Sequence, residues 1–233
     1  MSRSAIKLHT PAGRKALDKM MHEAERRAQE QADPKSSKSS RPAAAGAGEV
    51  RIIGGQWRRT RLPVARQPGL RPTPDRVRET LFNWLGQDLG GWRCVDAFAG
   101  TGALGFEAAS RGAASVFMNE LDAGLAQQLQ GLKTRLRAEQ VQIVRGDAIG
   151  FLRQRAPLSV DLVLLDPPFG ADALFEPALA ATHACLAGGG LAYLEAPRQW
   201  SGEELAALGF ALHRHMKAGA VHAHLLRKVE SES

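Results

Sequence analysis

Short apolar runs alternate with helix-like segments from residue 92 onward, and this alternation predicts the fold. The apolar runs are Arg93–Phe98, Ser115–Asn119, Val141–Val144, Asp161–Leu165 and Leu191–Leu194. The segments between them with helical character are Ala103–Arg111, Asp122–Arg137, Ala148–Gln154 and Ala173–Leu186. Strands that alternate with helices form a mostly parallel sheet with helices on both faces. We therefore expect an α/β fold.

A β-hairpin is predicted at each end of this region. Before it, Val50–Ile53 is rich in β-branched residues, a Gly-Gly pair favours a turn, and Trp57–Val64 follows as a second strand. At the end of the chain, Phe210–Lys217 and Val221–Lys228 flank an Ala-Gly pair. Two strands joined by so short a turn pair antiparallel, so the sheet is expected to end in an antiparallel hairpin.

A helix is predicted after the first hairpin. Thr73 is a favourable N-cap, and Pro74 suits the first helical position. Val77, Leu81 and Leu85 then recur every four residues, which gives the helix one buried stripe. Three charged residues on this helix are interpreted either as ligand or RNA contacts or as exposed surface: Arg76, Arg78 and Glu79.

Composition and charge divide the chain into three parts: a basic, flexible tail (residues 1–48), a hairpin and helix (49–90) and the α/β domain (91–233). Residues 35–48 are rich in Ser, Ala, Gly and Pro, which is typical of a linker. Ten Lys or Arg oppose five Asp or Glu in residues 1–48, and eight oppose four in residues 49–90. Since the whole chain carries +7, all of the excess positive charge precedes residue 91. This distribution favours contact with a polyanion, although a solubilising tail remains an alternative for residues 1–48.

The chain shows no sign of a metal site, a disulfide framework or a membrane segment. Cys94 and Cys185 are far apart and form no CxxC pair. Four histidines alternate between residues 213 and 224, but no carboxylate or thiol accompanies them, so we expect no bound metal. No apolar run approaches the roughly 20 residues of a membrane span, and the N-terminus lacks the apolar stretch of a secretory signal. We expect a cytoplasmic monomer.

A glycine-rich loop follows the first strand of the α/β domain. Gly100, Gly102 and Gly105 lie where the strand turns into a helix, at the carboxyl end of an open sheet, where such folds bind ligands. Their spacing also fits G-x-G-x-x-G, so this loop alone is compatible with a dinucleotide.

Acidic residues at the ends of the next two strands narrow the choice of ligand. Glu120 is placed to accept hydrogen bonds from both ribose hydroxyls, and Asp147 from an adenine amino group, although each is also a plausible helix cap. Asp96 is expected to orient the glycine loop or to meet a methionine amine. The ligand these positions suit is S-adenosylmethionine. The residues expected to bind it are Asp96, Phe98, Gly100, Thr101, Gly102, Glu120, Asp147 and Ala148.

A D-P-P-F motif directly follows the apolar run Asp161–Leu165. An exocyclic amine on a base is a poor nucleophile because its lone pair is delocalised into the ring, so an enzyme must hold its N–H groups with acceptors. The carboxylate of Asp166 is one acceptor, and the carbonyl of Pro167 is a second, held by a Pro167-Pro168 pair that has no N–H. Phe169 is placed to stack on the base. The predicted catalytic residues are therefore Asp166, Pro167, Pro168 and Phe169.

The motifs together resemble a known family, the bacterial 16S rRNA guanine-N2 methyltransferases that modify guanine 966 of the small subunit. The similarity lies in Arg51–Pro63, Gly69–Leu85, Asp96–Arg111 and Asp161–Phe169. It implies a class I, Rossmann-like methyltransferase fold with a seven-stranded sheet, S-adenosylmethionine as donor, and 16S rRNA or the 30S subunit as partner. Residues 1–48 have no counterpart in the family pattern.

Basic and aromatic residues ahead of the α/β domain are candidates for RNA contact. Arginines reach phosphates, and an indole can stack on an unpaired base. The candidates are Trp57, Arg58, Arg59, Arg61 and Arg71, with a charged edge strand as the alternative explanation. Two other functions stay open: a DNA adenine-N6 or cytosine-N4 methyltransferase, and a non-catalytic RNA-binding protein with a methyltransferase fold.

Overall fold

The computed structural model of the chain describes residues 48–64 and 73–229. Almost all of the predicted basic tail and the RNA-contact candidate Arg71 therefore lie outside the described residues. None of the described helices is long and apolar enough to cross a lipid bilayer.

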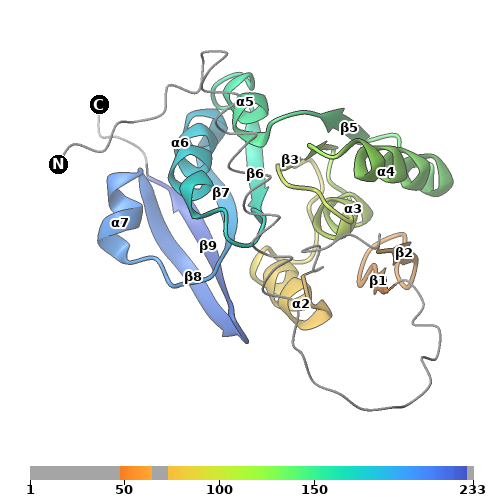
Figure 1. Cartoon of the computed structure of the whole chain (residues 1–233), viewed down its shortest axis with the longest axis horizontal. Coiled ribbons are helices and arrows are strands. Elements are labelled where there is room, and N and C mark those ends of the chain that lie inside the picture. Colours follow the sequence, from red (N-terminus) through yellow and green to blue (C-terminus); the bar gives the residue numbers. More distant parts are fainter. Residues whose placement is uncertain (1–47, 65–72, 230–233) are drawn as a thin grey trace, which may run out of the picture.

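A seven-stranded sheet forms the centre of the molecule, in the strand order β5-β4-β3-β6-β7-β9-β8 (Figure 1). The strands are β3 (Arg93–Asp96), β4 (Ser115–Glu120), β5 (Val141–Arg145), β6 (Val160–Leu165), β7 (Leu186–Ala196), β8 (Phe210–Ala218) and β9 (Val221–Lys228). β3 to β7 are parallel, and β9 and β8 complete the sheet as an antiparallel hairpin. The predicted fold class is confirmed.

Helices cover both faces of this sheet (Figure 1). One buried cluster joins the sheet to α2 (Asp75–Trp84), α3 (Ala103–Ser110) and α4 (Ala123–Leu136). A second cluster on the other face joins it to α5 (Ala148–Arg153), α6 (Phe175–Cys185) and α7 (Gly202–Ala207), with a short 3₁₀ helix, η1 (Asp172–Leu174), before α6. The sequence prediction missed α7, although Ser201 and Glu204 form a capping box at its start.

The N-terminal hairpin is shorter than predicted. It pairs β1 (Glu49–Arg51) with β2 (Arg61–Pro63), and Trp57 to Arg59 lie in the turn rather than in a strand that begins at Trp57. The turn packs against the C-terminal end of α3 instead. The Trp57 N–H donates to the hydroxyl of Ser110 at 2.9 Å, and the Gln56 N–H donates to the Ser110 carbonyl at 2.8 Å. The start of this segment therefore docks on α3, and only Arg59 and Thr60 still bond to Ile52 across the hairpin.

Gly55 permits this docking, and we expect Gly55→Ala to destabilise the protein. Gly55 has a φ of +72°, and a Cβ there would lie 1.8 Å from the Ser110 carbonyl oxygen. Left-handed backbone costs an L-residue about 1–2 kcal/mol, and overpacking adds about 1–3 kcal/mol. Gly86→Ala is the matched control, because Gly86 also has a positive φ but faces open space. Urea denaturation should show a larger loss of unfolding free energy for Gly55→Ala; equal losses would contradict the docking contact.

Candidate active site

The carboxyl ends of β3, β4, β5 and β6 bring most of the predicted site residues to one edge of the sheet. β3 lies between β4 and β6, and Asp96 is in register with Met118 of β4 and Leu164 of β6. Glu120 ends β4 beside Arg145, the last residue of β5. The glycine loop, the two strand-end acids and the D-P-P-F segment therefore share one edge, as expected for parallel strands.

The glycine loop is tied to β3 by a buried carboxyl. Asp96 is 1% exposed, and its Oδ2 accepts a hydrogen bond from the Gly105 N–H at 2.9 Å. Burial raises the pKa of Asp96 to about 7, and the charge of Glu120 adds to the rise. Within the part of the chain that the structure describes, Oδ1 of Asp96 has no well-formed hydrogen bond, although the nearby Phe98 N–H acts on the carboxyl and lowers its pKa. A buried carboxyl oxygen without a well-formed hydrogen bond is a ready acceptor for an N–H group of a ligand.

Glu120 also holds the glycine loop. Its Oε2 accepts from the Gly100 N–H at 2.8 Å and its Oε1 from the Asp122 N–H at 2.9 Å. Burial raises its pKa. Asp122, not Glu120, caps α4, because the Asp122 side chain accepts from the Leu125 N–H. Helix capping therefore does not explain the acid at the end of β4.

Asp147 behaves differently from Glu120, because it is the N-cap of α5. Its side chain accepts from the N–H groups of Ile149 and Gly150, the latter at 2.6 Å. On β4, the amide of Asn119 donates to the carbonyls of Ala97 and Gly146, so one side chain fixes the loops that follow both neighbouring strands, β3 and β5. The sequence prediction did not include Asn119.

The remaining cofactor candidates line the same loops. Thr101 and Ala148 are buried, and Phe98 is half-buried. Gly100 and Gly102 have φ values of +51° and +80°, which favour glycine at both positions.

The D-P-P-F segment leaves the sheet at the end of β6. Pro167 is buried, Pro168 is half-buried and Phe169 is 62% exposed. Oδ2 of Asp166 accepts a hydrogen bond from the Thr73 hydroxyl at 3.3 Å. Burial raises the pKa of Asp166 well above its usual range, and the charges of Glu195 and Asp96 add to the rise. A large exposed ring beside a shielded carboxyl suits stacking of a planar ligand whose N–H groups face the carboxyl.

Thr73 corrects one sequence prediction. Helix α2 begins at Asp75, its N-cap residue is Pro74, and no side chain caps it. Thr73 is buried, and its hydroxyl reaches Asp166 instead of the helix N-terminus. The sequence around Thr73 fits a local helix cap, but its hydroxyl bonds to Asp166, which lies 93 positions further along the chain.

Arg78 corrects a second interpretation, because it is fully buried rather than available to ligand, RNA or solvent. Its Nη2 donates to Asp75 at 2.7 Å, its Nε donates to the Thr73 carbonyl, and its Nη1 lies 3.5 Å from Oε2 of Glu107. Arg78 therefore fixes the turn that carries Thr73.

Sequence reasoning also missed Glu195 and Tyr193 on β7. The Tyr193 hydroxyl donates to Oε1 of Glu195 at 2.8 Å, and both side chains are buried. A signal was present: Glu195 directly follows the apolar run Leu191–Leu194, as Asp166 follows its own strand.

The RNA-contact candidates lie on the N-terminal hairpin. Trp57 is half-buried against the α2–α4 face, while Arg58 and Arg59 are exposed. Arg61 pairs with Glu49 at 2.9 Å, and Arg135 of α4 donates to the Arg61 carbonyl.

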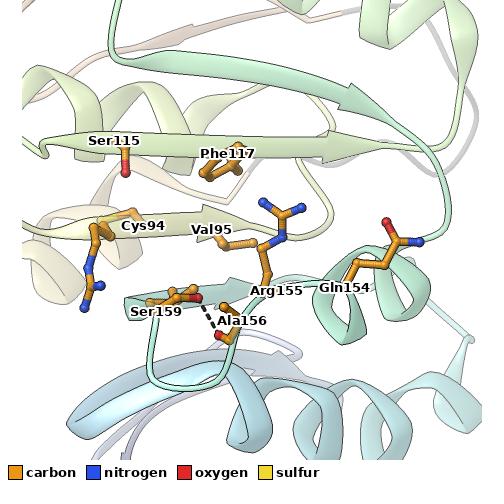
Figure 2. A pocket seen from close by; sticks show the side chains of 10 residues that line it. Cys94, Val95, Ser115, Phe117, Gln154, Arg155, Ala156 and Ser159 are labelled. Atoms are coloured by element: carbon orange, nitrogen blue, oxygen red, sulfur yellow. Dashed lines mark hydrogen bonds between the residues drawn. The ribbon is translucent and has the colours of Figure 1, made fainter.

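A separate cavity of about 330 Å³ opens at the opposite end of β3 and β4 (Figure 2). Cys94 and Ser115 line it from the starts of these strands, and Arg155 stacks over the Phe117 ring at 4.9 Å. Burial raises the pKa of Cys94 to about 12, so its thiol is a poor nucleophile. This cavity is therefore not part of the candidate active site.

The sheet order, the glycine loop and the acids at the strand ends define the class I methyltransferase fold. A S-adenosylmethionine-dependent O-methyltransferase from Thermotoga maritima, 20% identical, shares this fold with a TM-score of 0.56 over 70% of this chain and 68% of that chain. The solved structure of yhhF from Escherichia coli matches 78% of this chain and 99% of its own, with 36% identity and a TM-score of 0.67.

Sequence comparisons show the family. The family described as "Conserved hypothetical protein 95" matches residues 50–227. The ribosomal RNA small subunit methyltransferase D of Escherichia coli K12 is 42% identical over 83% of this chain and 98% of its own length. The Haemophilus influenzae protein of the same name is 50% identical over 52% of this chain and 65% of its own. The chain belongs to the ribosomal RNA small subunit methyltransferase D family, which confirms the resemblance found in the sequence.

Proposed function

We propose that this protein transfers a methyl group from S-adenosylmethionine to N2 of a guanine in 16S rRNA, on the 30S subunit or an assembly intermediate. The observation that carries the proposal is the half-buried Asp166 carboxyl at the end of β6, whose pKa is raised well above its usual range by burial, three residues before the exposed ring of Phe169. Family membership supports the substrate class, because the related proteins are named for the small-subunit ribosomal RNA.

The edge of the sheet fits the methyl donor. Asp96 has a buried oxygen without a well-formed hydrogen bond, which suits an amine, and the left-handed glycines let the loop approach a ligand closely. We assign Glu120 to the ribose hydroxyls and Asp147 to the adenine amine, with Phe98, Thr101 and Ala148 lining the same site. When bound, S-adenosylmethionine supplies a methyl group activated by a sulfonium.

The D-P-P-F residues act on the acceptor base. The Asp166 carboxylate and the Pro167 carbonyl accept hydrogen bonds from the two N–H groups of the guanine amine, which turns the nitrogen lone pair toward the methyl group. Pro168 holds the loop rigid, and Phe169 stacks on the base. Acceptors that stabilise positive charge developing on N2 lower the barrier, and positioning contributes most of the remaining rate.

The charge of the N-terminal hairpin supports the proposal that the partner is an RNA. Arg58 and Arg59 are exposed, and the net charge of residues 49–90 is +4, from eight Arg against four acids. We assign phosphate contacts to these arginines, to Arg61 and to Arg71, and base contact to Trp57. The proposal needs one copy of the chain, because every assigned residue comes from it, and it places the protein in the cytoplasm with the ribosomal subunits.

Labelled methyl transfer tests the substrate. Purified protein is incubated with labelled S-adenosylmethionine and with 30S subunits, naked 16S rRNA or duplex DNA, the RNA substrates taken from cells that lack this protein. Digestion to nucleosides should yield N2-methylguanosine from an RNA substrate. N6-methyladenine or N4-methylcytosine from DNA would overturn the substrate, and no label in any nucleic acid would favour the non-catalytic alternative.

Glu120→Ala is expected to weaken binding of S-adenosylmethionine about 10- to 100-fold. The substitution removes an acceptor for the ribose hydroxyls and releases the Gly100 N–H, and a hydrogen bond to a charged group is worth about 1.5–3 kcal/mol. Isothermal titration calorimetry measures the Kd without the methylation reaction. The control is Glu139→Ala, an exposed glutamate just before β5, at the opposite edge of the sheet. Equal affinity of both variants would contradict the assignment.

A further inference from the structure

Asp166 and Glu195 are neighbours by strand register. Leu165 of β6 is paired with Leu194 of β7 in the parallel ladder. The residues that directly follow this pair are the two acids, Asp166 and Glu195. Leu165 and Leu194 both belong to the core on the α5–α7 face. Because side chains alternate along a strand, the two carboxyls point to the other face, where Tyr193 packs with α2.

The two carboxyls are shielded from solvent to different degrees, since Glu195 is buried and Asp166 is half-buried. Glu195 is 6% exposed and accepts from the Tyr193 hydroxyl at 2.8 Å, while Asp166 accepts from the Thr73 hydroxyl at 3.3 Å. Asp96 at the end of β3 adds a third carboxyl.

Among the described residues, Arg78 of α2 is the one cation that acts on this pair of carboxyls, and it acts on Glu195. Arg78 is also engaged by Asp75 and by Glu107 of α3. The β9 residues buried on this face are the uncharged Ala223 and Leu225, and Arg227 further along the strand is exposed. The group is therefore rich in carboxyls and poor in compensating cations.

Burial raises the pKa of both Asp166 and Glu195, and the charge of Glu195 raises that of Asp166 further. The Thr73 hydroxyl opposes the rise at both carboxyls. Tyr193 and Arg78 oppose it at Glu195. Two adjacent carboxyls, one buried and one half-buried, resist carrying two negative charges, as in other carboxyl pairs that share one proton.

We propose that Glu195 is a positioning residue for methyl transfer: it shares one proton with Asp166 and, with the Thr73 hydroxyl, sets whether Asp166 is charged when the guanine binds. The proposal rests on the proposed function, in which a charged Asp166 holds the guanine amine. Glu195 acts through Asp166, because Tyr193 and the sheet enclose it.

The proton balance of the reaction gives the pair a role. As the bond from N2 to the methyl carbon forms and the carbon–sulfur bond of the donor breaks, the sulfonium becomes a neutral thioether and N2 must lose one proton. A pair that holds one proton has a net charge of −1 and takes up this second proton to become neutral. The site therefore returns to its starting state by releasing one proton after the product leaves.

Two substitutions are expected to move the titration of Asp166 in opposite directions. Glu195→Gln removes the neighbouring charge and should lower the pKa of Asp166 by about one to two units. Thr73→Val is nearly isosteric, removes the hydroxyl that favours the charged form and should raise that pKa. Since methylation needs charged Asp166, the acidic limb of kcat against pH on 30S subunits should move to lower pH in Glu195→Gln and to higher pH in Thr73→Val. Glu139→Gln is the control and should leave the titration of Asp166 and the dependence of kcat on pH unchanged.

Carbon-13 NMR of labelled carboxyl groups measures the titration without substrate, with the Asp166 signal identified by its loss in Asp166→Asn. Opposite shifts in the two variants support the proposal. Ordinary titration of Asp166 in the unsubstituted protein, or no shift in Glu195→Gln, overturns it. If Glu195→Gln does not fold, Thr73→Val decides alone, and an unchanged signal overturns the proposal. If the two variants shift the pKa of Asp166 in opposite directions but the protein methylates no nucleic acid, the coupling of Asp166 and Glu195 is supported and the proposed function is rejected.

Discussion

Asp166→Asn is expected to lower kcat about 100- to 1,000-fold while binding of S-adenosylmethionine persists. Asparagine replaces one acceptor oxygen with an N–H donor, which opposes the guanine amine instead of holding it. Loss of one preorganised group that stabilises the transition state typically costs this much. Single-turnover methylation of 30S subunits under saturating donor measures the chemical step.

Folding is not expected to explain this loss. The pKa of Asp166 is raised in the folded state, so the folded protein favours the neutral form, and its stability falls as pH rises from the ordinary carboxyl range toward the raised pKa. Neutral asparagine should therefore leave the unfolding free energy at pH 7 equal or higher. Asp172→Asn, an exposed acid in the following 3₁₀ helix, is the matched control for kcat. Full activity of Asp166→Asn would contradict the catalytic assignment.

Glu107→Ala is expected to reduce the unfolding free energy by about 3–5 kcal/mol, the usual cost of removing one partner from a buried ionic network. Glu107 is completely buried in α3. Its carboxylate accepts from the N–H groups of Ile53 and Gly54 at 2.7 and 2.8 Å and from Nε of Arg111 at 2.9 Å, and it pairs with Arg78. Alanine would leave these buried donors without their acceptor.

Urea denaturation measures this loss, and Glu79→Ala on the exposed face of α2 is the control, with an expected change of about 0.5 kcal/mol or less. The network joins the N-terminal hairpin to α2, which follows the turn that carries Thr73. A loss below about 1 kcal/mol for Glu107→Ala would show that the hairpin does not depend on this carboxylate.

Most of the fold was predictable, because buried parallel strands produce apolar runs that a sequence shows directly. The five runs between Arg93 and Leu194 and the final hairpin all correspond to strands. The segment that begins at Trp57 was assigned wrongly, because Trp57 to Arg59 form a turn whose first N–H bonds to Ser110 of α3, and no local pattern records that partner. Helix α7 was missed because it is six residues long.

The candidate site was predictable where an acid or glycine ends a strand, as at Asp96, Glu120 and Asp166. It was not predictable where long-range packing decides the role of a side chain. Thr73 fits a helix cap in sequence but bonds to Asp166, and Arg78 fits an exposed helix position but is buried against Glu107. Glu195 carried the same strand-end signal as Asp166, and only the register between β6 and β7 shows that the two are adjacent.

Modification of 16S rRNA in living cells tests the central claim most directly. Cells that lack this protein are supplied with the unsubstituted protein, with Asp166→Asn or with Asp172→Asn, and the nucleosides of their 16S rRNA are identified by mass spectrometry. The account predicts that the unsubstituted protein and Asp172→Asn restore one N2-methylguanosine per 16S rRNA and that Asp166→Asn does not. Restoration by Asp166→Asn, or no N2-methylguanosine gained with the unsubstituted protein, would contradict it.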